Sequence, residues 1–240
     1  MDFSQNDLSI ILNCYDNFEF NNDKVILKVN PTLKYPSTDF PHWLQTIQES
    51  TLDVTDKNIL IVGRSPQSVC MLLGSKLYSA RTVTLLGLSI YPKFLQLNQD
   101  ITEHTFHLSV DSKCNDVGPT VIYFTIKAEN AISSAMIPSE IGVKHIITGN
   151  PLLEGNCIVT KENEDITACI CKSMLDSAMK RARELTGPND PVYLATSTPL
   201  LLAVLFGVVV RENILDRKIC LLDRSGGNSL YNVVWPCYTV

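Results

Sequence analysis

Two short turns in this sequence carry residues that suit the binding of an anion. Ser65-Pro66 and Thr198-Pro199 each follow an apolar run typical of a strand and precede an apolar run typical of a helix. A helix N-terminus attracts negative charge through its free N–H groups and the positive end of its dipole. A hydroxyl residue before proline is also an ordinary helix start, in which the hydroxyl caps and proline takes the first helical position. Phosphate binding and simple capping are both open at this point.

Polar and aromatic side chains flank these turns and the loops that follow the next strands. A guanidinium suits phosphate or base contacts, and a tyrosine ring stacks on a base with about 1–3 kcal/mol. The candidate ligand-binding residues are Arg64, Ser65, Tyr91, Lys93, Thr196, Ser197, Thr198, Arg224, Ser225, Gly226 and Tyr231. The alternative for each is structural: a solvated charge, a flexible surface loop, or a tyrosine packed against its own loop.

Known catalytic and metal-binding motifs are absent from the sequence. It has no Gly-x-Ser-x-Gly, no Walker lysine motif and no Gly-x-Gly-x-x-Gly. His104 and His107 have a spacing that suits a helix but lack a matching set of strong ligands, so we interpret them as surface or packing residues. Cys169-x-Cys171 is too tight for the usual zinc hook. We therefore expect neither an enzyme nor a bound cofactor.

Composition excludes several other classes of protein. The 240 residues are 45% hydrophobic and 19% charged. This composition is sufficient for a substantial core and is unlike that of a disordered chain or a coiled coil. The net charge of −5 argues against binding long nucleic acid through a broad basic surface. It is compatible with a small anionic ligand in a local pocket.

The cysteines and the N-terminus predict a cytoplasmic protein. The eight cysteines include several inside apolar runs, and the acidic N-terminus lacks the pattern of a signal peptide, so we expect reduced, packed thiols. The apolar run 199–210 is too short for a membrane span, and a helix apolar on every side is a buried one. We expect it to lie between two layers and expect no membrane partner.

The elements that must position the candidate residues alternate between strands and helices. Near-continuous apolar runs, typical of a parallel sheet covered on both faces, predict strands at 59–63, 82–86, 120–126, 144–149, 192–196 and 218–222. Apolar residues at every fourth position predict an amphipathic helix over 166–185, ended by Gly187 and Pro188. The first fifty residues are less regular, with two possible strands and a loop entering a helix near Trp43.

An internal repeat links the two turns. Ser65-Pro66 and Gly74 match Thr198-Pro199 and Gly207 at a constant offset of 133 residues, without a gap. Each unit is a strand, a hydroxyl residue, a proline, a helix with an internal glycine, and a second strand. The glycine allows a helix to approach its neighbour closely. Two such units either face each other across a pseudo-twofold axis and share one pocket, or are simply two Rossmann-like layers without a ligand.

These units resemble SAVED domains. The strand, turn, glycine-containing helix, second strand and final tyrosine in VYLATSTPLLLAVLFGVVV and KICLLDRSGGNSLYNVVWP are similar to the C-terminal half of that family. SIILNCYDNF with Trp43, and ILIVGRSPQSVCMLLG, are similar to its opening elements and first unit. The helix at 166–185 is similar to the connector between the halves. The resemblance covers nearly the whole chain.

The resemblance implies an α/β fold of two pseudo-symmetric, Rossmann-like (CARF-like) units with mostly parallel sheets and helices on both faces. It implies a single domain over 1–240, with the first CARF-like half at 1–150 and the connector helix and second half at 151–240. SAVED domains bind cyclic oligonucleotide second messengers, chiefly cyclic tri- and tetranucleotides, in the CBASS and type III CRISPR branches of anti-phage defence. Ser65 and Thr198 match the turns that face the ligand in this family.

The function implied is binding of a cyclic oligonucleotide in a pocket between the halves. Because 240 residues leave no room for an effector, we expect a sensor subunit with a separate effector, a sponge that sequesters the messenger, or an excised domain. Ligand-driven homo-oligomerisation is a further expectation. The alternatives are a Rossmann-like enzyme that binds and cleaves a nucleotide ligand, and a pure assembly subunit.

Overall fold

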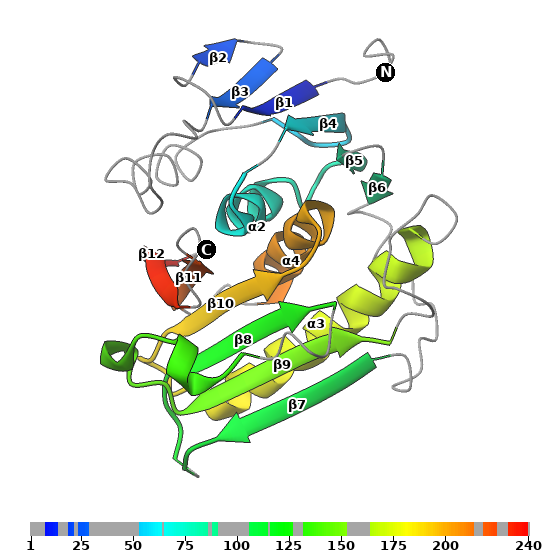
Figure 1. Ribbon diagram of the computed structural model, residues 1–240. Coiled ribbons are helices and arrows are strands. Elements are labelled where there is room, and N and C mark those ends of the chain that lie inside the picture. Colours follow the sequence, from blue (N-terminus) through cyan, green and yellow to red (C-terminus); the bar gives the residue numbers. More distant parts are fainter. Residues whose placement is uncertain are drawn as a thin grey trace.

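The described strands form two sheets, with helices in the layer between them (Figure 1). The structure is a computed structural model of the chain. It describes residues 8–13, 19–21, 24–28, 53–63, 65–85, 88–90, 106–114, 116–126, 132–152, 164–213, 218–224 and 230–239.

The first sheet is built from the first ninety residues. Its strand order is β2–β3–β1–β4–β5–β6, in which β3, β1, β4 and β5 run parallel and the edge strands β2 and β6 run antiparallel to their neighbours. The bounds are β1 Leu8–Asn13, β2 Glu19–Asn21, β3 Lys24–Lys28, β4 Asn58–Gly63, β5 Thr82–Leu85 and β6 Leu88–Ile90.

The second sheet repeats this arrangement. From edge to edge it reads β7–β9–β8–β10–β11–β12, with β9, β8, β10 and β11 parallel and the two edge strands antiparallel. The bounds are β7 Phe106–Ser112, β8 Thr120–Thr125, β9 His145–Pro151, β10 Val192–Ser197, β11 Lys218–Arg224 and β12 Tyr231–Thr239. The α/β fold with two similar, mostly parallel sheets is therefore confirmed.

The boundary between the two sheets lies between Ile90 and Phe106, not at residue 150. β8 pairs with both β9 and β10, so these strands belong to one sheet. A division of the chain at residue 150 therefore separates strands that are hydrogen-bonded to one another. The apolar runs at 120–126 and 144–149 predicted strands correctly, but apolar content does not say which neighbour a strand will pair with.

The helices fill the space between the sheets (Figure 1). α2 (Gln67–Lys76) belongs to the first half and packs directly against α4 (Leu200–Asn213) of the second half. α3 (Glu164–Leu185) lies beside α4 and against β7, β8 and β9, so it covers the same face of the second sheet. Residues 201–210 of α4 are all buried, which confirms the prediction of a buried helix between two layers.

The contact between α2 and α4 depends on one glycine from each helix. A Cβ at Gly207 would overlap the backbone carbonyl oxygen of Met71 and lie 2.9 Å from the backbone nitrogen of Ser75. A Cβ at Gly74 would overlap the carbonyl oxygen of Val204 and lie 3.1 Å from the Cα of Gly207. The two glycines that matched in the internal repeat therefore meet at the axis that relates the halves.

Polar contacts also tie the halves together at the N-terminus of α2. The Oδ2 atom of Asp223, on β11, accepts hydrogen bonds from the backbone N–H of Ser68 at 3.1 Å and from the Ser68 hydroxyl at 2.6 Å. Its Oδ1 atom accepts from the backbone N–H of Arg224 at 2.8 Å. A carboxylate from the second half thus binds one of the first N–H groups of a helix in the first half, where negative charge is favourable.

The outer face of the second sheet carries a separate, smaller core. A segment with two 3₁₀ helices, Ser134–Met136 and Ser139–Ile141, belongs to this core and follows β8. The core contains three tyrosines among its twelve buried members, which are Val121, Tyr123, Ile132, Ile137, Ile141, Val143, Ile146, Tyr193, Ala195, Cys220, Leu222 and Tyr231.

All six strands and the helix predicted from apolar patterns are present, with ends that differ by three residues or fewer. Sequence reasoning did not identify β6, β7 and β12. β7 is largely exposed and mostly polar, so it lacks the continuous apolar run by which the other strands were predicted. The expected helix near Trp43 lies outside the described residues.

Two further expectations concern cysteines and membranes. Cys220 is disulfide-bonded, so the expectation that the thiols are reduced is wrong for this residue. Cys70, Cys114, Cys169 and Cys171 are reduced thiols outside any disulfide bond. Within the described ranges, no helix combines the length and the apolar character that a membrane crossing requires.

Gly207→Ala tests the contact between α2 and α4. In an unobstructed helix this substitution stabilises by about 1 kcal/mol. Here the methyl group meets backbone atoms of α2, so we expect the free energy of unfolding to fall by about 1–3 kcal/mol or more. Urea unfolding measures it, and Lys180→Ala on the exposed face of α3 is the control. An unchanged or raised stability would show that the helices have room to spare.

Asp223→Ala tests the polar link. Hydrogen bonds to a charged group contribute about 1.5–3 kcal/mol, and we expect a loss of that size in the free energy of unfolding. A double-mutant cycle with Ser68→Ala isolates the part carried by the hydroxyl. Asp111→Ala, at an exposed position of β7, is the matched control. A coupling energy of zero would contradict the contribution of the hydroxyl, and an Asp223→Ala variant as stable as the unmodified protein would contradict the whole link.

Candidate ligand-binding site

The two turns meet where the halves contact each other. β4 ends at Gly63, just before the first turn, and β10 ends at Ser197, inside the second. The Nε2 atom of Gln67 donates a 2.7 Å hydrogen bond to the carbonyl oxygen of Thr198. The carboxyl ends of these strands and the N-terminal ends of α2 and α4 therefore lie side by side. Open α/β sheets bind their ligands at such strand ends.

The first turn differs in detail from the sequence-based expectation. Pro66 occupies the N-cap position of α2, not the first helical position, and no side chain caps the helix from there. The Ser65 hydroxyl instead donates to the carbonyl oxygen of Pro66 at 3.2 Å and lies 3.1 Å from Cys70 Sγ. The prediction that the Ser65 hydroxyl caps α2 is therefore wrong. Burial raises the pKa of the Cys70 thiol to about 12, so the thiol stays protonated at neutral pH.

The second turn begins its helix in the same way. The backbone N–H of Ala203 donates to the carbonyl oxygen of Pro199 at 3.2 Å. The hydroxyls of Thr196 and Thr198 are 2.9 Å apart and hydrogen-bonded, and both residues are buried. Ser197 is half-buried and is the most accessible of the three predicted hydroxyl residues.

Arg224 and Tyr231 form a pair at the next strand end. They are directly opposite each other in the β11–β12 register, and the guanidinium carbon lies 5.0 Å from the centre of the tyrosine ring. Arg224 is exposed, whereas Tyr231 is only 2% exposed. Tyr123 packs edge-on against Tyr231, with ring centres 6.2 Å apart. In this structure the Tyr231 ring supports the guanidinium and has no exposed face on which a base could stack.

The hydroxyls of Tyr123 and Tyr231 are both buried, and the Tyr231 hydroxyl interacts with Tyr123 and with Arg224. Burial, with the electrostatic effect of Tyr123, raises the pKa of the Tyr231 hydroxyl well above its ordinary value. The hydroxyl therefore remains protonated and able both to donate and to accept.

Ligand binding stays a prediction for every candidate residue, and five of the candidates also lie outside the described residues. They are Arg64, Tyr91, Lys93, Ser225 and Gly226. Among the described candidates, the structure brings together the two turns. It also brings β11, which ends in Arg224, to the first turn through Asp223.

Sequence reasoning missed three residues that organise this region: Gln67, Ser68 and Asp223. Gln67 and Ser68 are the first residues of α2 and make the hydrogen bonds that join the halves. Asp223 follows an apolar strand, where a polar residue is common in any loop. The contact from Asp223 to Ser68 spans 155 residues, and no local pattern signals it.

The two helix N-termini are therefore not equivalent, although their units repeat. Asp223 already binds the N–H of Ser68 at the start of α2. Leu201, the residue of α4 that corresponds to Ser68, has no side-chain hydroxyl with which to make the same contact. The backbones of the two units are therefore similar, but the Asp223 carboxylate binds at the N-terminus of α2 without a matching contact to Leu201.

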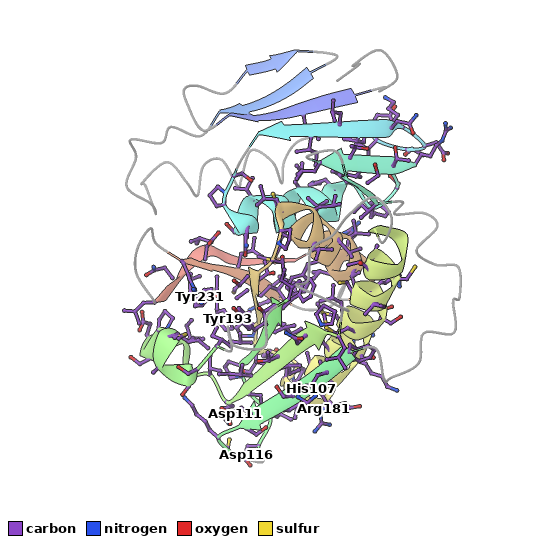
Figure 2. All side chains as sticks on the ribbon, turned by 45° about the vertical axis from the view of Figure 1, so that its right-hand side comes forward. His107, Asp111, Asp116, Arg181, Tyr193 and Tyr231 are labelled. Atoms are coloured by element: carbon purple, nitrogen blue, oxygen red, sulfur yellow. The ribbon has the colours of Figure 1, made fainter. Side chains whose placement is uncertain are left out.

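The two described histidines lie elsewhere, and His104 is outside the described residues. His107 is exposed on β7, and Figure 2 shows it with Asp111 far from Tyr231 and Tyr193. His145 is buried, with Nδ1 2.9 Å from the Ser112 hydroxyl and Nε2 2.8 Å from the Asp116 carbonyl oxygen. In the part of the chain that the structure describes, no three His, Cys, Asp or Glu side chains are grouped to hold a metal ion.

Sequence comparison and structural comparison give different results. No protein-family model matches the sequence, and no curated protein matches it. The structure is similar to the Cap4 SAVED/CARF-domain containing receptor of Acinetobacter baumannii. With the receptor solved with the cyclic trinucleotide 2′3′3′-cAAA, the TM-score is 0.61 at 14% identity, covering 95% of this chain and 51% of the receptor. With 3′3′3′-cAAA the TM-score is 0.58, again at 14% identity, covering 94% of this chain and 50% of the receptor.

The Moraxella osloensis Cap4 SAVED/CARF-domain containing receptor is also similar, with a TM-score of 0.56 at 14% identity, covering 95% of this chain and 49% of the receptor. This chain thus spans about half the length of each receptor. At such identities the likeness concerns the fold and not the activity. The resemblance seen in the sequence is confirmed at that level: the chain has the SAVED/CARF fold.

Proposed function

We propose that this protein binds a cyclic oligonucleotide second messenger where its two halves meet. The observation that carries the proposal is that two repeated strand–turn–helix units meet at the carboxyl ends of their strands, joined by the hydrogen bond from Gln67 to Thr198. The fold in which they meet is shared with receptors solved with cyclic trinucleotides. A pseudo-twofold arrangement suits a ring-shaped ligand because each half contacts part of the ring.

The contacts that we propose come from strand ends and loops of both halves. Arg224 is an exposed cation whose guanidinium is held over Tyr231 and is suited to a phosphate or a base. Ser197, at the end of the neighbouring strand β10, offers a half-buried hydroxyl. Arg64 and Lys93 are the cations that we propose for the first half. An acidic protein of net charge −5 needs such local cations to hold a polyanion.

The biological role that we propose is a sensor subunit or a sponge in anti-phage signalling in the cytoplasm. A sensor hands the signal to a separate effector or assembles into a homo-oligomer, whereas a sponge holds the ligand without either. Size-exclusion chromatography with and without the ligand separates these roles: a shift to a larger species on ligand addition supports assembly, and an unchanged monomer favours a sponge.

Isothermal titration with cyclic di-, tri- and tetranucleotides tests the proposal. We expect saturable binding of a cyclic tri- or tetranucleotide and weaker binding at higher salt, since cations contact the phosphates. Chromatography of the ligand after incubation is part of the same experiment. Recovery of intact ligand supports a receptor, and recovery of linear products favours the alternative of a cleaving enzyme. The proposal is wrong if none of the ligands binds.

Arg224→Ala tests the site on β11. Loss of a charge-assisted hydrogen bond, about 1.5–3 kcal/mol, corresponds to roughly 10- to 100-fold weaker binding. The matched control is Lys218→Ala, which removes an exposed cation from the opposite end of the same strand. We expect this control to bind like the unmodified protein. Equal losses from both variants would mean that net charge, and not the position of Arg224, matters.

A further inference from the structure

The second sheet ends in β7, which pairs on one side only with a described strand, namely β9 (Figure 1). The backbone N–H of Lys113, one residue after β7, donates to the carbonyl oxygen of Lys144 at 2.9 Å, so the backbone of Lys113 points toward β9. Backbone groups alternate in direction along a strand, so those of Leu108, Val110 and Ser112 point away from β9. An edge of this kind is a template on which another strand can pair.

The side chains of β7 differ between the two faces of the sheet. Leu108 packs against the main core, on the face that α3 covers. Val110 lies on the same face by alternation but is 38% exposed. His107, Ser109 and Asp111 are exposed on the opposite, outer face. The strand therefore presents apolar side chains on one face and an imidazole and a carboxylate on the other.

The sequence of β7 is complementary to itself when a second copy runs antiparallel to it. With Ser109 opposite Ser109 of the second copy, all seven residues of the strand are paired. His107 then lies opposite Asp111 twice, and cross-strand pairs of this kind are stabilising. The next register that keeps the faces matched is centred on Val110, and it places His107 opposite Lys113. The charges therefore favour the register centred on Ser109.

We infer that β7 is the contact surface of a symmetric dimer, in which two copies of this chain pair their β7 strands antiparallel about Ser109. The second sheets of the two copies then form one continuous sheet. Leu108 and Val110 of opposite copies lie across from each other, so the exposed side of Val110 is covered. A twofold contact uses the same patch on both copies, and a self-complementary strand meets this requirement.

This dimer is separate from the proposed ligand site. The strand order places β7 at one edge of the second sheet and β11, which carries Arg224, next to the other edge. The pairing therefore needs no ligand. A contact made mainly by one strand from each copy buries a small area, and such contacts are weak. We expect a monomer at the low concentrations at which unfolding and ligand-driven assembly are measured, and a dimer near millimolar concentration.

Oxidative cross-linking of the full chain at high concentration tests the register. In the proposed dimer the two Ser109 residues form a non-hydrogen-bonded pair with Cα atoms about 4.5 Å apart, which is close enough for a disulfide bond. We expect Ser109→Cys to give at least tenfold more linked dimer than Ser112→Cys, whose two positions are about 20 Å apart. Both variants keep the same native cysteines. Equal linking of both variants, or none in Ser109→Cys, would overturn the inference.

Sedimentation velocity at rising concentration tests the charge pairs. Asp111→Lys places a lysine opposite His107, and His107→Asp places two carboxylates opposite each other, so we expect each variant alone to dimerise at least fivefold more weakly than the unmodified chain. A one-to-one mixture of the two variants has an acid opposite a base at both positions, and we expect it to dimerise at least as strongly as the unmodified chain. The mixture also controls for misfolding, because a misfolded variant would not regain pairing.

Two results would refute the β7 dimer. One is an unmodified chain that stays monomeric at the highest concentration. The other is a mixture of Asp111→Lys and His107→Asp that dimerises no more strongly than either variant alone.

Discussion

The close approach of α2 and α4 is the constraint on which the rest of the structure depends. Gly74 and Gly207 bring the two backbones so near that a methyl group on either would meet carbonyl oxygens of the other helix. Because each helix follows directly on a strand of its own sheet, this contact fixes how the sheets lie relative to each other. Protein interiors are close-packed and not continuously deformable, so a contact between backbones, without intervening side chains, defines a single arrangement.

That arrangement creates the region where the halves exchange hydrogen bonds. Gln67 reaches the carbonyl oxygen of Thr198, and Asp223 binds Ser68 at the start of α2. These contacts make the repeated units unequal, because the carboxylate comes from one half only. The two repeated units therefore differ in the polar contacts at their helix N-termini, although their strands and helices follow the same order.

The second sheet presents different chemistry on its two faces. One face packs against α3 and α4 in the main core, and the other carries the smaller core with three tyrosines. Tyr231 belongs to this smaller core, and its ring supports the exposed guanidinium of Arg224. Tyr231 thus links the end of β11 to the smaller core through its contacts with Arg224 and Tyr123.

Apolar patterns in the sequence determined the α/β class, the strands around Ile59 and Val192, the amphipathic helix and the buried helix, because these follow from local periodicity. The repeat also identified the two glycines that meet. Only the tertiary structure decided that β7 to β9 join the second sheet and that Tyr231 is buried. It also decided that Asp223, and not Ser65, accepts a hydrogen bond from the backbone at the N-terminus of α2. Each of these depends on contacts between residues far apart in the chain, and such pairings are selected by the packing of the whole molecule, not by the residues that flank them.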